Sequence, residues 1–253
     1  MSEESKKEIP AEILELLRRL SQASELYVLM SDCTKEPYVV CNPETFDDEI
    51  ILFFDDKEAK QEAKRLAEEK IPVSPARLEN KQLLLFFSSL YTMGVNALLV
   101  KRGGSEALIQ LEDLVKRKDL SKLPDGNKWI ENPSLHLTAL YFAQEYRRPA
   151  GPEDSSRLEE LQEEMTAHFG RGSFIFAIQQ EGNATPMVKL KDELVYQPVF
   201  TDVLEFQKFN RENKFRPVVV AAENIPKVLS KESAGVILNL LGVNLPLLLK
   251  KHG

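Results

Sequence analysis

The sequence predicts an α+β (mixed α/β) protein made of two tandem homologous units, each a mixed β-sheet with packed helices. Two observations predict this fold class. Similar blocks of residues recur in the same order in both halves of the chain, and apolar runs of strand length alternate with amphipathic helix patterns. We therefore expect each unit to follow the order helix, strand, strand, strand, helix, strand, helix, strand, or αβββαβαβ.

The repeat is clearest where each half ends. The tripeptide Gly-Val-Asn stands at residues 94 to 96 and again at 242 to 244, 148 positions later. Earlier blocks match in the same order, 144 to 148 residues apart: 27–32 with 174–180, 49–66 with 194–209, 71–80 with 215–224, and 81–93 with 228–241. Short apolar segments that are similar by chance would not recur in the same order, so a duplicated unit is predicted.

Each unit is predicted to open with a helix, over 13–24 in the first copy and 158–169 in the second, followed by an apolar strand. The run from Glu49 to Phe54 is almost continuously apolar, as in a strand buried on both faces. The early strands lie close together in sequence and favour antiparallel hairpins. The later ones alternate with helices and favour parallel crossovers, so the sheet should be mixed.

The helix after this strand carries the same start signal in both copies. Asp55 with Glu58, and Asp202 with Glu205, have the spacing of a capping box, in which the first side chain binds free helix amides. An apolar stripe follows each cap: Ala59, Ala63, Leu66 and Ala67 in the first copy, and Val203, Phe206 and Phe209 in the second. One face of each helix should pack on a sheet.

Gly94 and Gly242 each follow an apolar pattern of helix length. Glycine is the usual left-handed residue after a helix because it has no Cβ, so we expect both to have positive φ just past a helix. The residues after Asn96 and Asn244 should then form strands. The alternative is that Asn96 and Asn244 belong to a pair of related pockets, which makes them the candidate binding residues of this sequence.

The repeat divides the chain into a first unit over 10–102, a connector over 103–156 and a second unit over 157–253. In the connector, 105–116 has the pattern of an extra strand, and Pro-Asp-Gly at 124–126 is a turn signal. A helix is expected over 131–148, with Asn132 as its cap and Pro133 in its first turn. The segment 149–156 is the predicted boundary.

Charge and cysteine content restrict the location and the partners. The formal net charge is −7, which argues against nucleic acid because phosphate contacts require Lys and Arg. The first residues contain no signal-peptide pattern, so a cytoplasmic location is expected. Cys33 and Cys41 flank a predicted hairpin and could approach each other across it, but in a cytoplasmic protein two reduced thiols are expected.

Two long uncharged runs, 83–100 and 233–249, raise the alternative of a membrane protein. Gly-Val-Asn divides each run into a helix-length piece and a strand-length piece. The neighbouring strands also need backbone partners, which a helix facing lipid cannot supply. Both runs are therefore expected in a buried core, with no membrane partner.

The sequence indicates no catalytic residue, no metal site and no cofactor. His136, His168 and His252 have no Cys, His or carboxylate at metal-ligand spacing. The densest acidic group is Asp47, Asp48, Asp55 and Asp56. These carboxylates could form a cation or general-base site, but one turn and one helix cap account for them equally well.

The second copy resembles a known family. Tyr-x-Pro-Val-Phe-Thr-Asp at 196–202, then a helix, Arg-Pro-Val-Val-Val at 216–220 and Gly-Val-Asn-x-Pro-Leu-Leu-Leu at 242–249 resemble the SseB-like domain. This is the family of the bacterial enhanced-serine-sensitivity protein. The first copy matches less well, with Phe-Asp-Asp at 54–56 and Asn-Ala at 96–97. The resemblance implies a cytoplasmic bacterial α/β protein and brings no catalytic residues with it.

Three functions remain open at this point. We favour a non-catalytic protein- or metabolite-binding protein, because every repeated feature has a role in folding. The alternatives are a hydrolase-type enzyme using the carboxylates near Asp47–Asp56 and, less favoured, a membrane-associated protein. The partner could be a protein or a small molecule, and the two units could pack on each other within one chain or across a homodimer.

Overall fold

The computed structural model describes residues 10–117, 129–149, 151 and 155–249. Its first unit contains α1 (Ala11–Gln22), β1 (Glu25–Ser31), β2 (Val39–Cys41), β3 (Asp48–Phe53), α2 (Asp56–Glu68), β4 (Val73–Glu79), α3 (Asn80–Met93), β5 (Ala97–Arg102), β6 (Ser105–Gln110) and α4 (Leu111–Leu114). Helix α5 (Pro133–Tyr146) then leads to the second unit.

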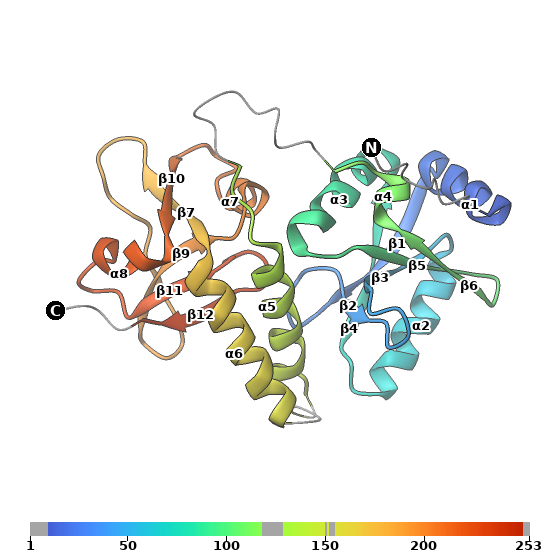
Figure 1. Cartoon of the computed structure of the whole chain (residues 1–253), viewed down its shortest axis with the longest axis horizontal. Helices are drawn as coiled ribbons and strands as arrows, with labels where there is room; N and C mark the ends of the chain where they lie inside the picture. The colour runs from blue at the N-terminus through green and yellow to red at the C-terminus, as the bar shows by residue number, and fades with distance from the viewer. Residues whose placement is uncertain (1–9, 118–128, 150, 152–154, 250–253) are drawn as a thin grey trace, which may run out of the picture.

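The second unit contains α6 (Ser155–Arg171), β7 (Ser173–Gln179), β8 (Val188–Lys189), β9 (Val195–Phe200), α7 (Val203–Phe209), β10 (Phe215–Ala221), the 3₁₀ turn η2 (Ala222–Asn224), α8 (Ile225–Val228), β11 (Gly235–Leu238) and β12 (Leu245–Leu248). Two sheets with packed helices confirm the predicted α+β fold with two similar units. Figure 1 shows these units as two lobes, with α5 and α6 between them.

Both sheets have the same topology. The strand order is β4-β1-β3-β5-β6 in the first, with β2 beside β3, and β10-β7-β9-β11-β12 in the second, with β8 beside β9. The pairs β1–β4 and β7–β10 are antiparallel over seven residues, whereas β3–β5 and β9–β11 are parallel. The mixed sheet expected from the spacing of the strands is therefore present twice.

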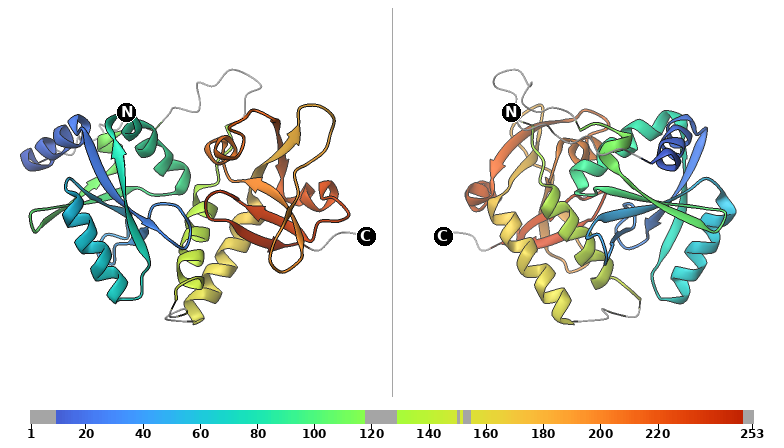
Figure 2. Two further views of the ribbon diagram at one scale, coloured as in Figure 1. Left: turned by 180° about the vertical axis from the view of Figure 1, so that it is seen from behind. Right: turned by 45° about the vertical axis from the view of Figure 1, so that its right-hand side comes forward.

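Each sheet has a private core on one face and contributes to a shared core with the other face. Helix α2 covers the private face of the first sheet, burying Ala59, Ala63 and Leu66, while Ala67 is exposed. Helix α7 covers the second sheet through Phe206. The largest cluster of buried side chains is continuous from the first sheet through α3, α5 and α6 to the second sheet. Figure 2 shows α5 and α6 between the lobes from two further directions.

Helix α5 is fastened to both units by polar side chains. Gln144 bonds the free edge of β2, accepting from the Val39 N–H (3.1 Å) and donating to the Val39 carbonyl (2.9 Å). Asn132 holds the predicted cap position, with Pro133 at the start of the helix, but its amide donates to the carbonyls of Ser173 and Thr201 in the second unit. The two units thus pack on each other within one chain.

The predictions made for the first Gly-Val-Asn are confirmed. Gly94 follows α3 with φ of 84°, and β5 begins directly after Asn96. The two helix caps are also confirmed, because Asp55 accepts hydrogen bonds from two amides of α2 and Asp202 from two amides of α7. The extra strand expected within 105–116 is β6, which pairs with β5.

The corresponding predictions for Gly242 are wrong. The helix expected over 228–241 is replaced by β11, and Gly242 lies in the turn from β11 to β12 without a positive φ. A short apolar run fits a helix or a strand equally well, and here parallel pairing with β9 selects the strand. Strand β11 is therefore the counterpart of β5, and the second Gly-Val-Asn occupies a different place in its unit. A strand does follow Asn244, as predicted.

The two uncharged runs contribute buried residues to the shared core, although several of their leucines are exposed. The run 83–100 contains parts of α3 and β5, and the run 233–249 contains β11 and β12. Among the residues that the structure describes, no helix has the length and apolar character needed to span a membrane. The predicted turn at 124–126, His252 and residues 150 and 152–154 of the predicted boundary lie outside the described residues.

The cysteines do not face each other across the predicted hairpin. The Ser31 amide bonds the Glu36 carbonyl, so Cys33 lies inside the turn itself. Cys41 is five residues beyond Glu36 in extended chain, about 16 Å at the usual rise of a strand. Both thiols are free.

Replacing Gln144 should weaken the attachment of α5 to the first unit. In Gln144→Met, the buried N–H and C=O of Val39 lose their partner, which lowers the free energy of unfolding by about 2 kcal/mol. Denaturation with urea measures this difference. Gln162→Met, at an exposed position of α6, is the matched control and should change stability by less than about 0.5 kcal/mol. Equal effects of the two substitutions would contradict this role of Gln144.

Candidate functional site

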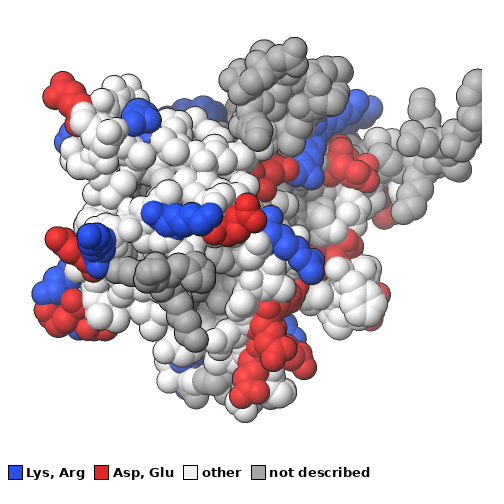
Figure 3. Space-filling model, turned by 60° about the vertical axis from the view of Figure 1, so that its left-hand side comes forward, with Lys and Arg blue, Asp and Glu red and all other residues white. Residues whose placement is uncertain are grey.

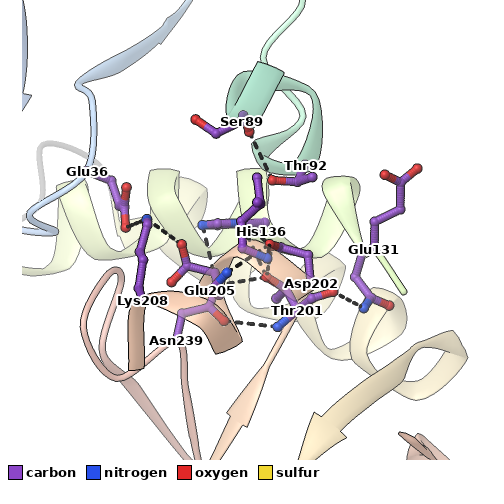
Figure 4. A network of polar contacts seen from close by, with 12 residues as sticks. Glu36, Ser89, Thr92, Glu131, His136, Thr201, Asp202, Glu205, Lys208 and Asn239 are labelled. Atoms are coloured by element: carbon purple, nitrogen blue, oxygen red, sulfur yellow. Dashed lines mark hydrogen bonds and ion pairs between the residues drawn. The ribbon is translucent and has the colours of Figure 1, made fainter. Parts of the chain in front are cut away.

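Two features of the second unit are candidates for a functional site: a buried polar network at the junction of the units and an apolar groove beside β12. The network contains Glu36 from the β1–β2 turn, His136 from α5, and Glu205 and Lys208 from α7 (Figure 4). It also contains Thr201 and Asp202, which precede α7, and Asn239, which follows β11. These segments are far apart in the sequence, and the packing of the units on α5 brings them together.

One half of the network is an ionic contact between the units. The Lys208 ammonium donates to Glu36 Oε1 (2.8 Å) and to Glu205 Oε1. The Glu36 and Glu205 side chains are 6% and 3% exposed, whereas Lys208 is 35% exposed. A single cation thus holds two buried carboxylates, one from each unit.

The other half surrounds His136. Its Nδ1 lies 3.5 Å from Asp202 Oδ2, and the Thr201 hydroxyl donates to the same carboxylate oxygen (2.8 Å). Asn239 completes the group by donating to Thr201 Oγ1 (2.8 Å) and accepting from the Thr201 amide (3.0 Å). All four residues are fully buried.

The charges of this network are mutually stabilised. Burial lowers the pKa of His136, but the hydrogen bond to Asp202 and the charges of Glu205, Asp202 and Glu36 outweigh burial and raise it above 6.5. Burial raises the pKa of Asp202, and the contact with His136 more than reverses this, so the result lies below 3.8. A raised pKa for His136 and a lowered pKa for Asp202 are what an imidazolium–carboxylate pair produces.

The ionic contact between the units shows the same balance. Burial, and then the charge of Glu205, raise the pKa of Glu36. Burial lowers the pKa of Lys208, but Glu36 and Glu205 together raise it above its usual value. Such buried pairs fix one arrangement of the groups around them more than they add stability.

This network is a joint rather than a catalytic site. A His, an Asp and a hydroxyl lie close together, but none of the three reaches solvent, so no substrate can contact them. Gly242 explains how the joint closes. A Cβ at this residue would lie 2.3 Å from Glu36 Oε1 and 2.9 Å from Glu205 Oε2, so the turn from β11 to β12 needs a residue without a side chain here.

The two candidate binding residues do not form related pockets. Asn96 donates to Asp47 Oδ1 (2.6 Å) and accepts from the Asp48 amide (2.7 Å), which fixes the start of β3. Asn244 lies in the turn before β12 with φ of 51°, and its carbonyl accepts from Arg147 (2.8 Å). Both asparagines are exposed and hold turns in place.

The acidic residues singled out in the sequence do not converge. Asp47 and Asp48 lie at the start of β3, and Asp55 and Asp56 lie beyond its end, about 20 Å away at the usual rise of a strand. Asp48 accepts from the Tyr141 hydroxyl (2.6 Å), and Asp56 pairs with Lys60. Over the described part of the chain, no group of three or more His, Cys, Asp or Glu side chains could hold a metal ion.

The second candidate is an open groove between α5, α6 and the edge strand β12, with a volume of about 590 Å³. Phe142 and Tyr146 stack along one wall, with ring centroids 5.6 Å apart. Met165 and Phe169 form the wall on α6, and the leucines of 245–249 form the wall on β12. Figure 3 turns the second unit towards the viewer and shows broad uncharged areas on this side of the molecule.

Comparisons with known proteins give little further guidance. No family model and no curated protein matches this chain. Among solved structures, Anabaena Tic22 (protein transport) is 9% identical, with a TM-score of 0.23 over 87% of this chain and 92% of that one. Tic22 from Plasmodium falciparum is 13% identical, with a TM-score of 0.22 over 87% of this chain and 90% of that one. Similarity at these TM-scores carries no information about function.

The raised pKa of His136 predicts a loss of stability in alkaline solution. A base whose pKa is raised by folding stabilises the folded state fully below its unfolded pKa, near 6.5, and this contribution is lost as pH rises through the folded pKa. The free energy of unfolding should therefore fall from pH 6 towards pH 9, as measured by urea denaturation. The raised pKa of Glu36 acts in the same direction at lower pH.

The control for this prediction is His168, which is partly exposed on α6 beside Glu164. His136→Gln should flatten the alkaline decline, whereas His168→Gln should leave it unchanged. A decline of the same steepness in both variants would show that His136 does not carry it.

Removing the cation of the joint should also destabilise the fold. In Lys208→Met the buried carboxylates of Glu36 and Glu205 lose the ammonium that bonds both of them, which costs about 2 kcal/mol, less than in a fully buried pair because Lys208 is partly exposed. Adding Glu36→Gln should recover part of this loss. Lys214→Met removes an exposed pair with Glu212 and should change stability by less than about 0.5 kcal/mol. A double variant less stable than Lys208→Met alone would argue against the ionic joint.

Proposed function

We propose that this chain is a non-catalytic binding protein that holds an apolar segment of another polypeptide in the groove between α5, α6 and β12. The observation behind this proposal is the exposed apolar surface of the groove. Leu248 is 69% exposed and Tyr146 is 61% exposed, on facing walls of one depression. Contiguous apolar surface of this kind usually marks an interaction site.

The chemistry of the lining defines the class of ligand. Phenyl rings, a methionine and leucines supply apolar contact, and a few polar groups on the rim, including Gln162 and Arg147, can fix its orientation. Two of the three groups that Arg147 donates to lie in the turn before β12, the carbonyls of Val243 and Asn244, so this end of the groove is held rigidly. A rigid apolar groove suits the apolar face of an amphipathic helix.

Addition of a partner strand to β12 is less favoured than side-chain packing. Among the strands that the structure describes, β12 lies at the edge of its sheet and pairs with β11. Pro246 in its middle has no N–H group, which weakens the edge as a template for another strand. The apolar side chains of the groove are therefore the main source of binding energy in this proposal.

Two broader assignments belong to the same proposal. Membership of the SseB-like family, with the cytoplasmic location that this resemblance implies, is supported by the motif residues in 196–202, 216–220 and 242–249. An enzymatic role is not proposed, because the carboxylates on which that alternative depended lie at opposite ends of β3.

Peptide binding tests the proposal. A fluorescein-labelled amphipathic peptide of Leu, Lys and Glu should bind the protein, as followed by fluorescence anisotropy. Leu248→Ser removes a contact worth about 1.5 kcal/mol or more when a leucine becomes buried, so the Kd should rise about tenfold.

Leu84→Ser is the matched control, because Leu84 is also 69% exposed but lies on α3 of the first unit. This substitution should leave the Kd unchanged. Equal Kd values for Leu248→Ser and the unmodified protein, or no binding by either, would refute the groove as a polypeptide site.

A further inference from the structure

A second cavity lies between the first unit and the helices α5 and α6. Its volume is about 400 Å³, within the range of small-molecule sites, and its walls come from the loops around β2, the α2–β4 loop, α5 and the start of α6. It is separate from the β12 groove, since no residue lines both. None of the groups in the polar joint lines it either.

One side of the cavity is apolar and ends in an exposed ring. Val39, Pro43, Ile71 and Pro72 form this side, and Phe46 stands at the rim. Phe46 is 78% exposed and has a φ of 59°, a conformation that is uncommon for a bulky residue.

The loop that carries Phe46 is held rather than loose. Asn42 accepts from the amides of Glu44 (2.9 Å) and Thr45 (3.2 Å), and its own carbonyl accepts from the Phe46 amide (2.9 Å). An unusual backbone conformation that the surroundings fix, with an aromatic ring in solvent beside a cavity, is typical of a ligand contact.

The lining also contains charged side chains. Two guanidinium groups, Arg148 and Arg157, line the cavity against one carboxylate, Glu145. Arg148 lies 3.5 Å from Glu145 and donates to the Glu69 carbonyl (3.0 Å), so Glu145 balances its charge. The charge of Arg157, at the exposed start of α6, is left for a ligand.

The phenol of Tyr38 adds a neutral donor. Burial raises the pKa of Tyr38 to about 12, so its hydroxyl keeps its proton at neutral pH and can donate a hydrogen bond. The other phenol of the lining, Tyr141, already donates to Asp48. The cavity therefore offers the Arg157 guanidinium, the Tyr38 hydroxyl and apolar side chains to a ligand.

We propose that this cavity binds a small organic anion, with its carboxylate or sulfonate at Arg157 and its aromatic or branched body against Val39, Ile71 and Phe46. Because the walls come from the first unit and from α5 and α6, such a ligand bridges the two halves of the molecule. This site is independent of the polypeptide groove, and either can exist without the other.

The dye 8-anilinonaphthalene-1-sulfonate is a suitable probe, because it combines a sulfonate with an aromatic body. Its fluorescence should rise on binding to the folded protein. The Kd should increase about tenfold in Arg157→Gln, which corresponds to the loss of one charge-assisted contact of about 1.4 kcal/mol. Arg157→Lys should restore most of the affinity. Arg171→Gln, at the other end of the same helix, is the matched control and should bind like the unmodified protein.

Two comparisons separate this cavity from the β12 groove. The Arg157→Gln effect should persist in a Leu248→Ser background, since Leu248 does not line the cavity. N-phenyl-1-naphthylamine, which lacks the sulfonate, should not distinguish Arg157→Gln from the unmodified protein. If Arg157→Gln and Arg171→Gln bind the sulfonate dye equally, the proposal is wrong, whatever the outcome of the peptide experiment.

The two thiols give an independent readout, because Cys33 and Cys41 both line the cavity. Bound dye should slow their reaction with a maleimide several-fold in the unmodified protein and not in Arg157→Gln. Phe46→Ser, a change at an exposed position, should weaken this protection without unfolding the protein. Thiol reaction rates that do not respond to the dye would overturn the location proposed here.

Discussion

The structure depends on α5 being buried from both sides while it carries polar groups that need partners. Gln144 and His136 are buried on this helix, and each finds its hydrogen bonds in a different unit. An unpaired polar group in such a place would cost about 1 to 3 kcal/mol, so each unit must present matching atoms at a fixed position. The shared apolar core then fills the space around α5, and the relative placement of the two sheets follows from these two attachments.

The ionic joint adds specificity to this arrangement. Glu36 comes from a turn of the first unit, whereas Lys208 and Glu205 lie on α7 of the second unit. Buried charges of this kind tolerate few alternative placements, because separation of either carboxylate from the ammonium leaves a charge without solvent or partner. The groove and the cavity both use α5 as a wall.

The sequence predicts those features that depend on local signals. Asp55 and Asp202 cap helices as their spacing indicates, Gly94 takes the left-handed conformation, and the order of elements in the first unit is as expected. Prediction fails where tertiary contacts decide. Strand β11 forms because β9 offers a parallel partner, and Gly242 is required by the space between two glutamates. The cap spacing accounts for Glu205, and the lysine three positions later is the only local sign of a buried pair.

The hydrogen bonds between Gln144 and Val39 also bear on how a duplicated chain diverges. One edge of β2 is bonded by the side-chain amide of a residue that belongs to neither repeat. The first copy therefore depends on the connecting segment to satisfy its backbone. The two copies are similar in topology but no longer exchangeable, and separating either copy from the connecting helix would expose backbone groups that side chains of this segment now bond. The two similar units therefore form one structural whole and not two independent domains joined by a linker.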